Sequence, residues 1–123
     1  MNADLDGVTL RKHHPKAPPR NLFANMNKTE EAFAHILEAQ KRSGEIREWH
    51  FEGLTLRLGD DCRYTPDFYT VEAAGFIHLH ETKGFMRDDA LVKLKTCATI
   101  HPFPLTLWLY SKGQWTRKPI SPL

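Results

Sequence analysis

The chain has 123 residues, of which 41% are hydrophobic and 26% charged, and its formal net charge is +2. This length suits one globular domain, and the composition excludes a fibrous or wholly disordered chain. A net charge of +2 is too small to indicate a nucleic-acid partner by itself. No apolar run is long enough to cross a membrane, and the first residues lack the apolar core of a secretion signal. We therefore expect a cytoplasmic protein with no membrane partner.

The two ends of the chain are more basic than its centre. Residues 1–28 contain five basic and two acidic side chains, and residues 111–123 contain three basic and no acidic ones. Residues 1–25 also contain three prolines and show no clean periodicity. We predict that they form a basic, partly disordered arm ahead of a single domain at residues 26–123. Basic ends around an acidic centre suit a site that holds metal in its middle and phosphate at its rim, but solvated tails explain the same charges.

The first regular element is predicted to be a helix at residues 27–42. Phe33 and Leu37 recur at helical spacing and mark its buried face. Asn27 is a suitable N-cap, and Glu30 follows three residues later, as in a capping box.

A region rich in strands is predicted to follow this helix. The expected strands are Ile46–Phe51, Leu54–Leu58, Tyr64–Val71 and Phe76–Thr82. Gly53 separates the first two strands, as in a hairpin. Pro66 enters the third strand, which suits the beginning of a strand or a sheet edge.

A second helix is predicted from Asp88 to Ile100, and prolines after it end the helix. A buried strand at Leu105–Tyr110 and a short hairpin into Gln114–Arg117 complete the chain. A helix leading into a strand indicates a crossover that adds a parallel or mixed edge to the sheet. The predicted fold class is therefore α/β, with a mixed central β-sheet flanked by helices in the order α-β-β-β-α-β.

Two short motifs carry the candidate chemistry. Asp67 lies in the sequence RYTPDF, and Glu81 and Lys83 follow in ETKG, with Glu81 14 residues after Asp67. Glu81 and Lys83 share one face of their strand, and an adjacent antiparallel strand brings Asp67 within about 5 Å. Paired carboxylates repel each other unless a cation lies between them, and their oxygens favour Mg²⁺ or Mn²⁺. A lysine beside that metal can bind phosphate or hold the attacking water, which indicates metal-assisted phosphodiester hydrolysis.

These motifs resemble the PD-(D/E)XK nuclease superfamily, and the chain is most similar to its small single-domain endonucleases from phage and prophage genomes. Asp67 matches the PD half of the motif, and Glu81 and Lys83 match the (D/E)XK half. The similar stretch runs from about residue 27 to residue 108. Thr82 departs from the pattern, since an aliphatic residue usually stands between the acid and the lysine.

The resemblance implies a restriction-endonuclease-like core and a metal-dependent DNA endonuclease that acts in phage DNA replication, recombination or processing in a bacterial host. It implies Mg²⁺, replaceable by Mn²⁺, on Asp67, Glu81 and the backbone carbonyl of Thr82. Lys83 would orient or deprotonate the attacking water. The glutamate of the family's first helix maps best onto Glu30, with Glu31 as the weaker match, and a capping-box role with Asn27 is the alternative for Glu30.

Basic residues outside the two motifs are expected to hold the phosphates of the DNA backbone, with salt-sensitive and sequence-independent affinity. They are Lys93, Arg87, Lys12, Lys16 and Arg20. A solvated helix face is the alternative for Lys93. His78 and His80 lie on the strand face opposite Glu81 and are expected to pack rather than to bind metal.

Two other functions fit the same residues. The first is a Holliday-junction or other branched-DNA resolvase, in which a homodimer would cut two strands symmetrically. The second is a non-catalytic nucleic-acid-binding accessory protein of a phage replication or recombination module. Dependence of strand cleavage on a divalent metal distinguishes the enzymes from the accessory protein.

Overall fold

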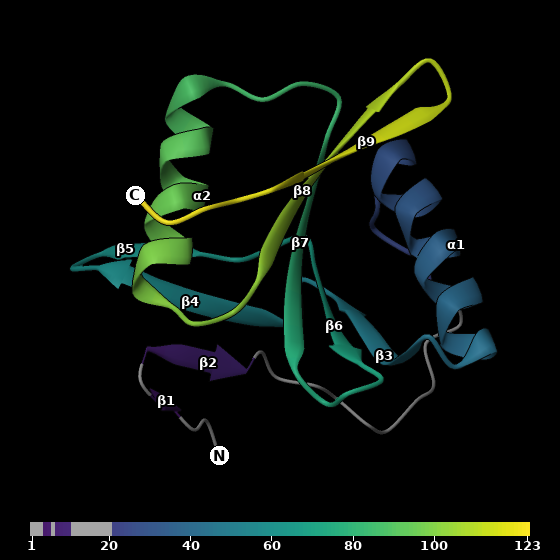
Figure 1. Cartoon of the computed structure of the whole chain (residues 1–123), viewed down its shortest axis with the longest axis horizontal. Coiled ribbons are helices and arrows are strands. Elements are labelled where there is room, and N and C mark those ends of the chain that lie inside the picture. The colour runs from purple at the N-terminus through teal and green to yellow at the C-terminus, as the bar shows by residue number, and fades with distance from the viewer. Residues whose placement is uncertain (1–3, 6, 11–20) are drawn as a thin grey trace.

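The structure is a computed structural model that describes residues 4–5, 7–10 and 21–123. These residues form a mixed α/β fold with two helices and two sheets (Figure 1). The helices are α1 (Lys28–Ser43) and α2 (Asp88–Ile100). The four-stranded sheet has the order β1 (Asp4–Leu5), β2 (Val8–Leu10), β4 (Leu54–Gly59), β5 (Cys62–Tyr64). The five-stranded sheet has the order β3 (Ile46–Phe51), β6 (Phe68–Glu72), β7 (Ile77–Lys83), β8 (Leu105–Ser111), β9 (Gln114–Pro119).

Helix α1 begins and ends at the signals present in its sequence. The Asn27 side chain accepts from the Glu30 amide at 2.8 Å, and the Glu30 carboxylate accepts from the Asn27 amide at 2.9 Å, which completes the capping box. Gly44 ends the helix with φ = 84°, a conformation that glycine adopts without steric cost. The predicted helix is therefore confirmed.

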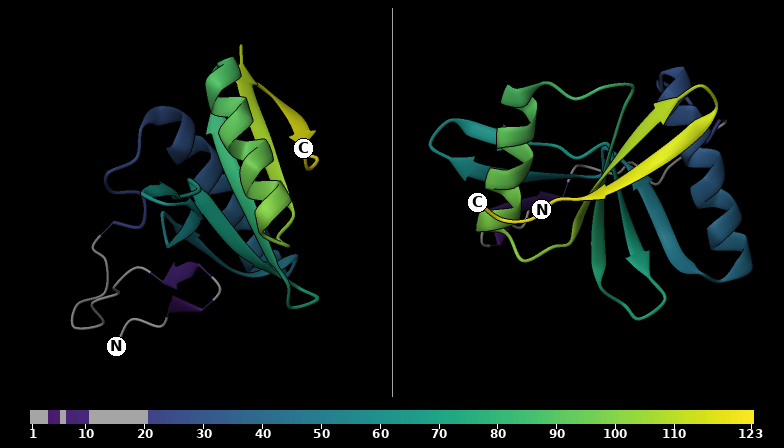
Figure 2. Two further views of the ribbon diagram at one scale, coloured as in Figure 1. Left: turned by 90° about the vertical axis from the view of Figure 1, so that its left-hand side faces the viewer. Right: turned by 45° about the horizontal axis from the view of Figure 1, so that its top comes forward.

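The five-stranded sheet is mixed, as predicted. Strands β7 and β8 pair in parallel, and the other neighbours in this sheet pair antiparallel. Helix α2 lies in the connection from β7 to β8, as a parallel pair requires. Figures 1 and 2 show α1 and α2 on different sides of the sheet.

The two faces of this sheet bury different clusters. On one face, Phe33 and Leu37 of α1 pack with Phe68 and Ile46. On the other face, residues of α2, the four-stranded sheet and the inner strands share one core: Leu54, Leu56, Tyr64, Leu79, Leu94, Cys97, Leu105, Leu107 and Ile120. Glu81 and Lys83, the candidate site residues of β7, lie on the same face of the strand as Leu79 of this second core.

The mixed central sheet does not include every predicted strand, because β4 belongs to the second sheet and does not pair with β3. Strand β3 pairs with β6, whereas β4 pairs with β2 and β5 in the other sheet. The chain changes sheets at Glu52, which has φ = 49°, and at Gly53. A Cβ at Gly53 would lie 2.5 Å from Cε2 of Tyr69, so this crossing requires glycine.

The predicted strand at Tyr64–Val71 is likewise divided. Tyr64 ends β5 in one sheet and Phe68 begins β6 in the other, so residues 65–67 form a second crossing between the sheets. Pro66 lies buried within this crossing and has no amide hydrogen to donate to a strand partner. Asp67 is consequently placed directly before β6 rather than inside a strand.

The N-terminal segment contains two strands that the sequence analysis did not predict. Strand β2 pairs antiparallel with β4, and β1 pairs with β2. The segment expected to be a partly disordered arm therefore includes residues that extend the four-stranded sheet. Neither helix in the described residues is long and apolar enough to cross a membrane.

Candidate active site

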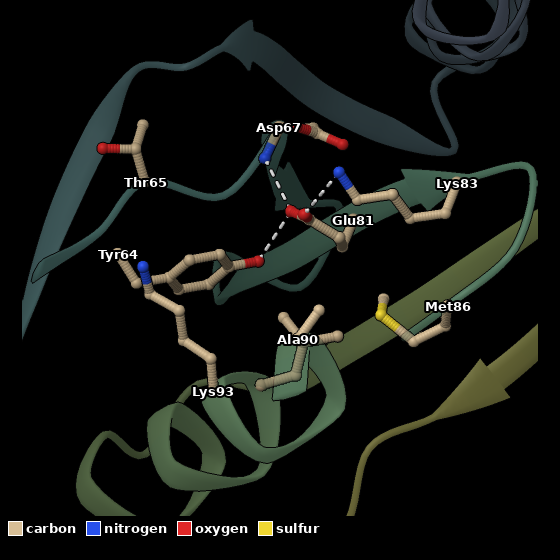
Figure 3. A pocket seen from close by; sticks show the side chains of 9 residues that line it. Tyr64, Thr65, Asp67, Glu81, Lys83, Met86, Ala90 and Lys93 are labelled. Carbon is tan, nitrogen blue, oxygen red and sulfur yellow. Dashed lines mark hydrogen bonds and ion pairs between the residues drawn. The ribbon is translucent and has the colours of Figure 1, made fainter. Parts of the chain in front are cut away.

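The register of β6 and β7 brings the two candidate carboxylates together. Phe68 lies opposite His80, so the preceding residue, Asp67, lies beside Glu81. The Asp67 amide donates to Oε1 of Glu81 at 3.2 Å (Figure 3). The Asp67 carboxylate turns toward the next residue of β7, where its Oδ2 accepts from the amide of Thr82 at 2.9 Å and from its hydroxyl at 3.1 Å. Both acids are thus held by hydrogen bonds between β7 and the end of the crossing that precedes β6.

Lys83 lies on the same face of β7 as Glu81, as strand alternation predicts. Its Nζ is 3.5 Å from Oε2 of Glu81. The Lys83 side chain is 43% exposed, whereas that of Glu81 is 10% exposed. The ammonium group is therefore available to solvent or to a ligand, although one carboxylate oxygen already neighbours it.

These three side chains line a pocket of about 320 Å³, called the carboxylate pocket below. Its other walls come from the end of β5, from the crossing at residues 65–67 and from α2 (Figure 3). The remaining lining residues are Tyr64, Thr65, Met86, Ala90, Lys93 and Leu94. The pocket therefore lies between the two sheets and one helix, with acids on one wall and Lys93 on the other.

The pKa values of both acids are raised. Burial raises the pKa of Asp67, while hydrogen bonds from Thr82 and the charge of Lys83 act against that rise. Burial also raises the pKa of Glu81, and the negative charge of Asp67 adds to the effect. Two neighbouring carboxyls that resist ionisation in this way are stabilised in their charged form by a cation.

The chemistry of this donor set fits a hard divalent cation. Asp67 and Glu81 offer carboxylate oxygens, which are the ligands preferred by Mg²⁺ and Mn²⁺. Within the described residues, no three His, Cys, Asp or Glu side chains lie close enough together to hold a metal ion. A cation bound here would therefore use the two carboxylates with a backbone oxygen, such as the carbonyl of Thr82, and with water.

Tyr64 is a site residue that the sequence analysis missed. Its buried hydroxyl donates to Oε1 of Glu81 at 2.7 Å. In one continuous strand, Tyr64 and Asp67 would point to opposite faces because they are three positions apart. The break around Pro66 cancels this alternation and turns both side chains into the same pocket. Only the tyrosine of the RYTPDF motif itself could have drawn attention to this position.

Glu30 lies close enough to the site for charges there to affect it, although it belongs to α1. Burial raises the pKa of Glu30, and the charges of Asp67 and Glu52 raise it further, while Lys83 acts in the opposite direction. Its Oε1 accepts from the Asn27 amide in the capping box. Glu30 therefore belongs to the helix cap and also lies within reach of the charges of Asp67 and Lys83.

Glu52 is a second residue that the sequence analysis missed. Its amide donates to the carbonyl of Asp67 at 2.8 Å, which ties together the two crossings between the sheets. Its left-handed backbone gave no sequence signal, because only the neighbouring Gly53 marks a turn.

The predicted phosphate-binding residues fall into three groups. Nζ of Lys93 lies 5.9 Å from the centre of the Tyr64 ring, within the carboxylate pocket. Arg87 is exposed and lines a neighbouring pocket together with Lys83. Lys12, Lys16 and Arg20 lie outside the described residues.

The two histidines of β7 pack as predicted. His80 is buried on the α1 side of the sheet, where its ring bonds to the Thr70 hydroxyl at 2.9 Å and to the Trp108 indole N–H at 3.0 Å. His78 stacks on His80 and bonds to the hydroxyl of Thr106. These contacts commit both rings to packing rather than to the carboxylate pocket.

Comparisons of the chain with protein-family models, with curated proteins and with solved structures found no match. The two motifs and the geometry of this pocket therefore carry the inference of function.

Proposed function

We propose that this protein is a metal-dependent endonuclease that hydrolyses phosphodiester bonds in DNA. The observation that carries the proposal is the pairing of Asp67 with Glu81 in a pocket that also holds Lys83. Buried Glu81 and half-buried Asp67 disfavour each other's negative charge, and a bound cation would relieve this repulsion while Lys83 contacts a phosphate. The resemblance of the two motifs to the PD-(D/E)XK superfamily points to the same chemistry.

Asp67, Glu81 and the carbonyl of Thr82 would hold Mg²⁺, and Mn²⁺ would substitute for it. A bound divalent ion supplies a Lewis acid, which lowers the pKa of water and stabilises negative charge on phosphate. Tyr64 and the Asp67 amide fix the orientation of Glu81 by donating to its Oε1. The hydrogen bonds from Thr82 fix Asp67 in the same way.

Lys83 neutralises the phosphate and orients the attacking water in this proposal. Its ammonium group is held near Glu81 but is exposed on the pocket side, so it can contact a phosphate oxygen without leaving the strand. Lys93, on the opposite wall, and Arg87, on the loop before α2, would hold neighbouring phosphates of the strand.

Cleavage assays with the purified protein test the proposal. We expect labelled DNA to be cut in Mg²⁺ or Mn²⁺, and we expect EDTA to abolish cutting. Asp67→Ala, Glu81→Gln and Lys83→Ala should each lower the rate at least about a hundredfold, because each removes charge from the reacting centre. Glu48→Gln and Lys112→Ala, on exposed parts of β3 and the β8–β9 turn, are matched controls that should retain the rate.

Two results would contradict this mechanism: retained cleavage by a correctly folded Lys83→Ala protein, or cleavage that continues in EDTA. DNA binding without cleavage in any metal would instead favour the accessory-protein hypothesis. A preference for branched DNA by a dimeric protein would favour the resolvase.

A further inference from the structure

The loop between β7 and α2 carries an apolar surface that the proposed chemistry does not use. Phe85 follows Lys83 by two residues, and 73% of its surface is exposed. A phenyl ring is usually among the groups that a fold buries. Its exposure beside a candidate catalytic lysine suggests a role in binding.

A second pocket, of about 340 Å³, opens beside this loop and is called the loop pocket here. It is lined by Lys83, Gly84, Phe85, Met86, Arg87 and Ala90. Lys83, Met86 and Ala90 also line the carboxylate pocket, so the two pockets adjoin. A ligand that reaches from one pocket into the other would pass over these three shared residues, of which Lys83 is the charged one.

The chemistry of the loop pocket favours a neutral group on Phe85 over a phosphate. Lys83 and Arg87, two residues to either side of Phe85 in the sequence, can each hold a phosphate, whereas the phenyl ring between them offers a phosphate no hydrogen-bond donor. A nucleotide whose phosphate lies at Lys83 would therefore place its base, rather than its next phosphate, over the phenyl ring. Bases of every kind offer an aromatic face for stacking.

We propose that the loop pocket binds an unpaired nucleobase next to the phosphate held at Lys83, with Phe85 as the stacking surface. In a duplex, neighbouring bases cover both faces of each base, so a protruding phenyl ring finds a free face only where bases are unpaired. This proposal rests on the proposed nuclease function and gives it a substrate class: DNA with unpaired bases beside the cut phosphate.

The experiment compares kcat/KM for a gapped duplex and for a fully paired duplex of the same sequence. Phe85→Ala should reduce the preference for gapped DNA about tenfold, since stacking on an aromatic side chain contributes about that factor to binding. Phe85→Trp should retain the preference. Phe76→Ala is the matched control, because Phe76 is also exposed (50%) but directly precedes the first residue of β7, at the opposite end of this strand from Lys83. This substitution should leave the preference unchanged.

An unchanged preference in Phe85→Ala, or an equal loss on both DNA substrates, would overturn the proposal. A separate measurement does not depend on cleavage. It records, in Ca²⁺, how far the protein quenches the fluorescence of 2-aminopurine in a single-stranded oligonucleotide. If no metal supports cleavage, the nuclease function fails. Quenching that is lost in Phe85→Ala would still support the base site, and equal quenching by both proteins would overturn it.

Discussion

The environment of Glu81 shows how single side chains define the candidate site. This carboxylate is buried, lies beside a second acid, and accepts hydrogen bonds from the Tyr64 hydroxyl and the Asp67 amide. A buried carboxylate needs such donors, because their loss leaves a charge with neither water nor partner. In the proposed function Tyr64 would therefore be a positioning residue, which acts through its hydrogen bond to Glu81.

We expect Tyr64→Phe to lower the cleavage rate about tenfold, because Glu81 then loses one of the two donors that fix its orientation. The lost hydrogen bond should lower the free energy of unfolding by about 1–2 kcal/mol. Cleavage kinetics and urea denaturation measure the two effects, and Tyr110→Phe on β8 serves as the control. A wild-type rate in Tyr64→Phe would show that the hydroxyl does not position Glu81.

The sequence predicted the residues of the site that depend on one regular strand. Glu81 and Lys83 are two positions apart on β7, so alternation alone placed them on one face. Tyr64 could not be found in this way, because its orientation depends on the break at Pro66. Glu52 could not be found either, since its amide reaches Asp67 only where two crossings between sheets meet.

Among the elements, α1 combines structural and candidate functional roles at its first turn. The side chains of Asn27 and Glu30 each accept a hydrogen bond from the other residue's backbone amide, which caps the helix. The charges of Asp67 and Lys83 also act on the Glu30 carboxylate. The two roles depend on different properties of the carboxylate: the cap needs an acceptor oxygen, and a metal site needs the negative charge. Conservative substitutions can therefore separate them.

We expect Asn27→Ala to lower the free energy of unfolding by about 1 kcal/mol and to retain cleavage, because only the cap is lost. Glu30→Gln keeps an acceptor oxygen, so it should cost less stability, but it should reduce cleavage at least about tenfold. Thermal denaturation and cleavage kinetics on both variants provide the comparison. Full activity in Glu30→Gln would assign Glu30 to the cap alone.

The sequence predicted both helices and most strands, because caps, prolines and apolar periodicity are local signals. The predicted boundaries of α2 and β3 agree with the structure, and the parallel pairing of β7 with β8 follows from the helix between them. The allocation of strands to two sheets was missed. It depends on the left-handed backbone at Glu52 and on the close approach of Gly53 to Tyr69, which no local pattern encodes.

At the scale of the whole molecule, the stability of the α1 side depends on a neutral histidine. Burial lowers the pKa of His80 to about 3, and the neighbouring His78 contributes to the shift. In the unfolded chain a histidine titrates near pH 6.5. As the pH falls from 6.5 to about 3, His80 binds a proton in the unfolded chain but not in the folded chain. The free energy of unfolding therefore decreases over this range.

We expect His80 to lower the free energy of unfolding by about 2 kcal/mol between pH 7 and pH 5. The raised pKa values of Asp67 and Glu81 act in the opposite direction, because folded carboxyls then bind protons more readily. The difference between wild type and His80→Gln, from urea denaturation at both pH values, isolates the histidine. Parallel pH dependences of the two proteins would contradict the assignment.

The hairpin between β6 and β7 has a consequence for how sequence length can vary in this protein. The turn at residues 73–76 directly joins β6, which follows Asp67, to β7, which holds Glu81. Side chains alternate between faces, so one residue inserted or deleted in this turn would move one acid along or across the sheet relative to the other. Such a change would separate the acid pair while leaving every candidate catalytic residue in the chain. The turn at residues 60–61, between β4 and β5, does not set the spacing of Asp67 and Glu81, so a change of length there would leave the acid pair in place and would affect only the position of Tyr64 on β5.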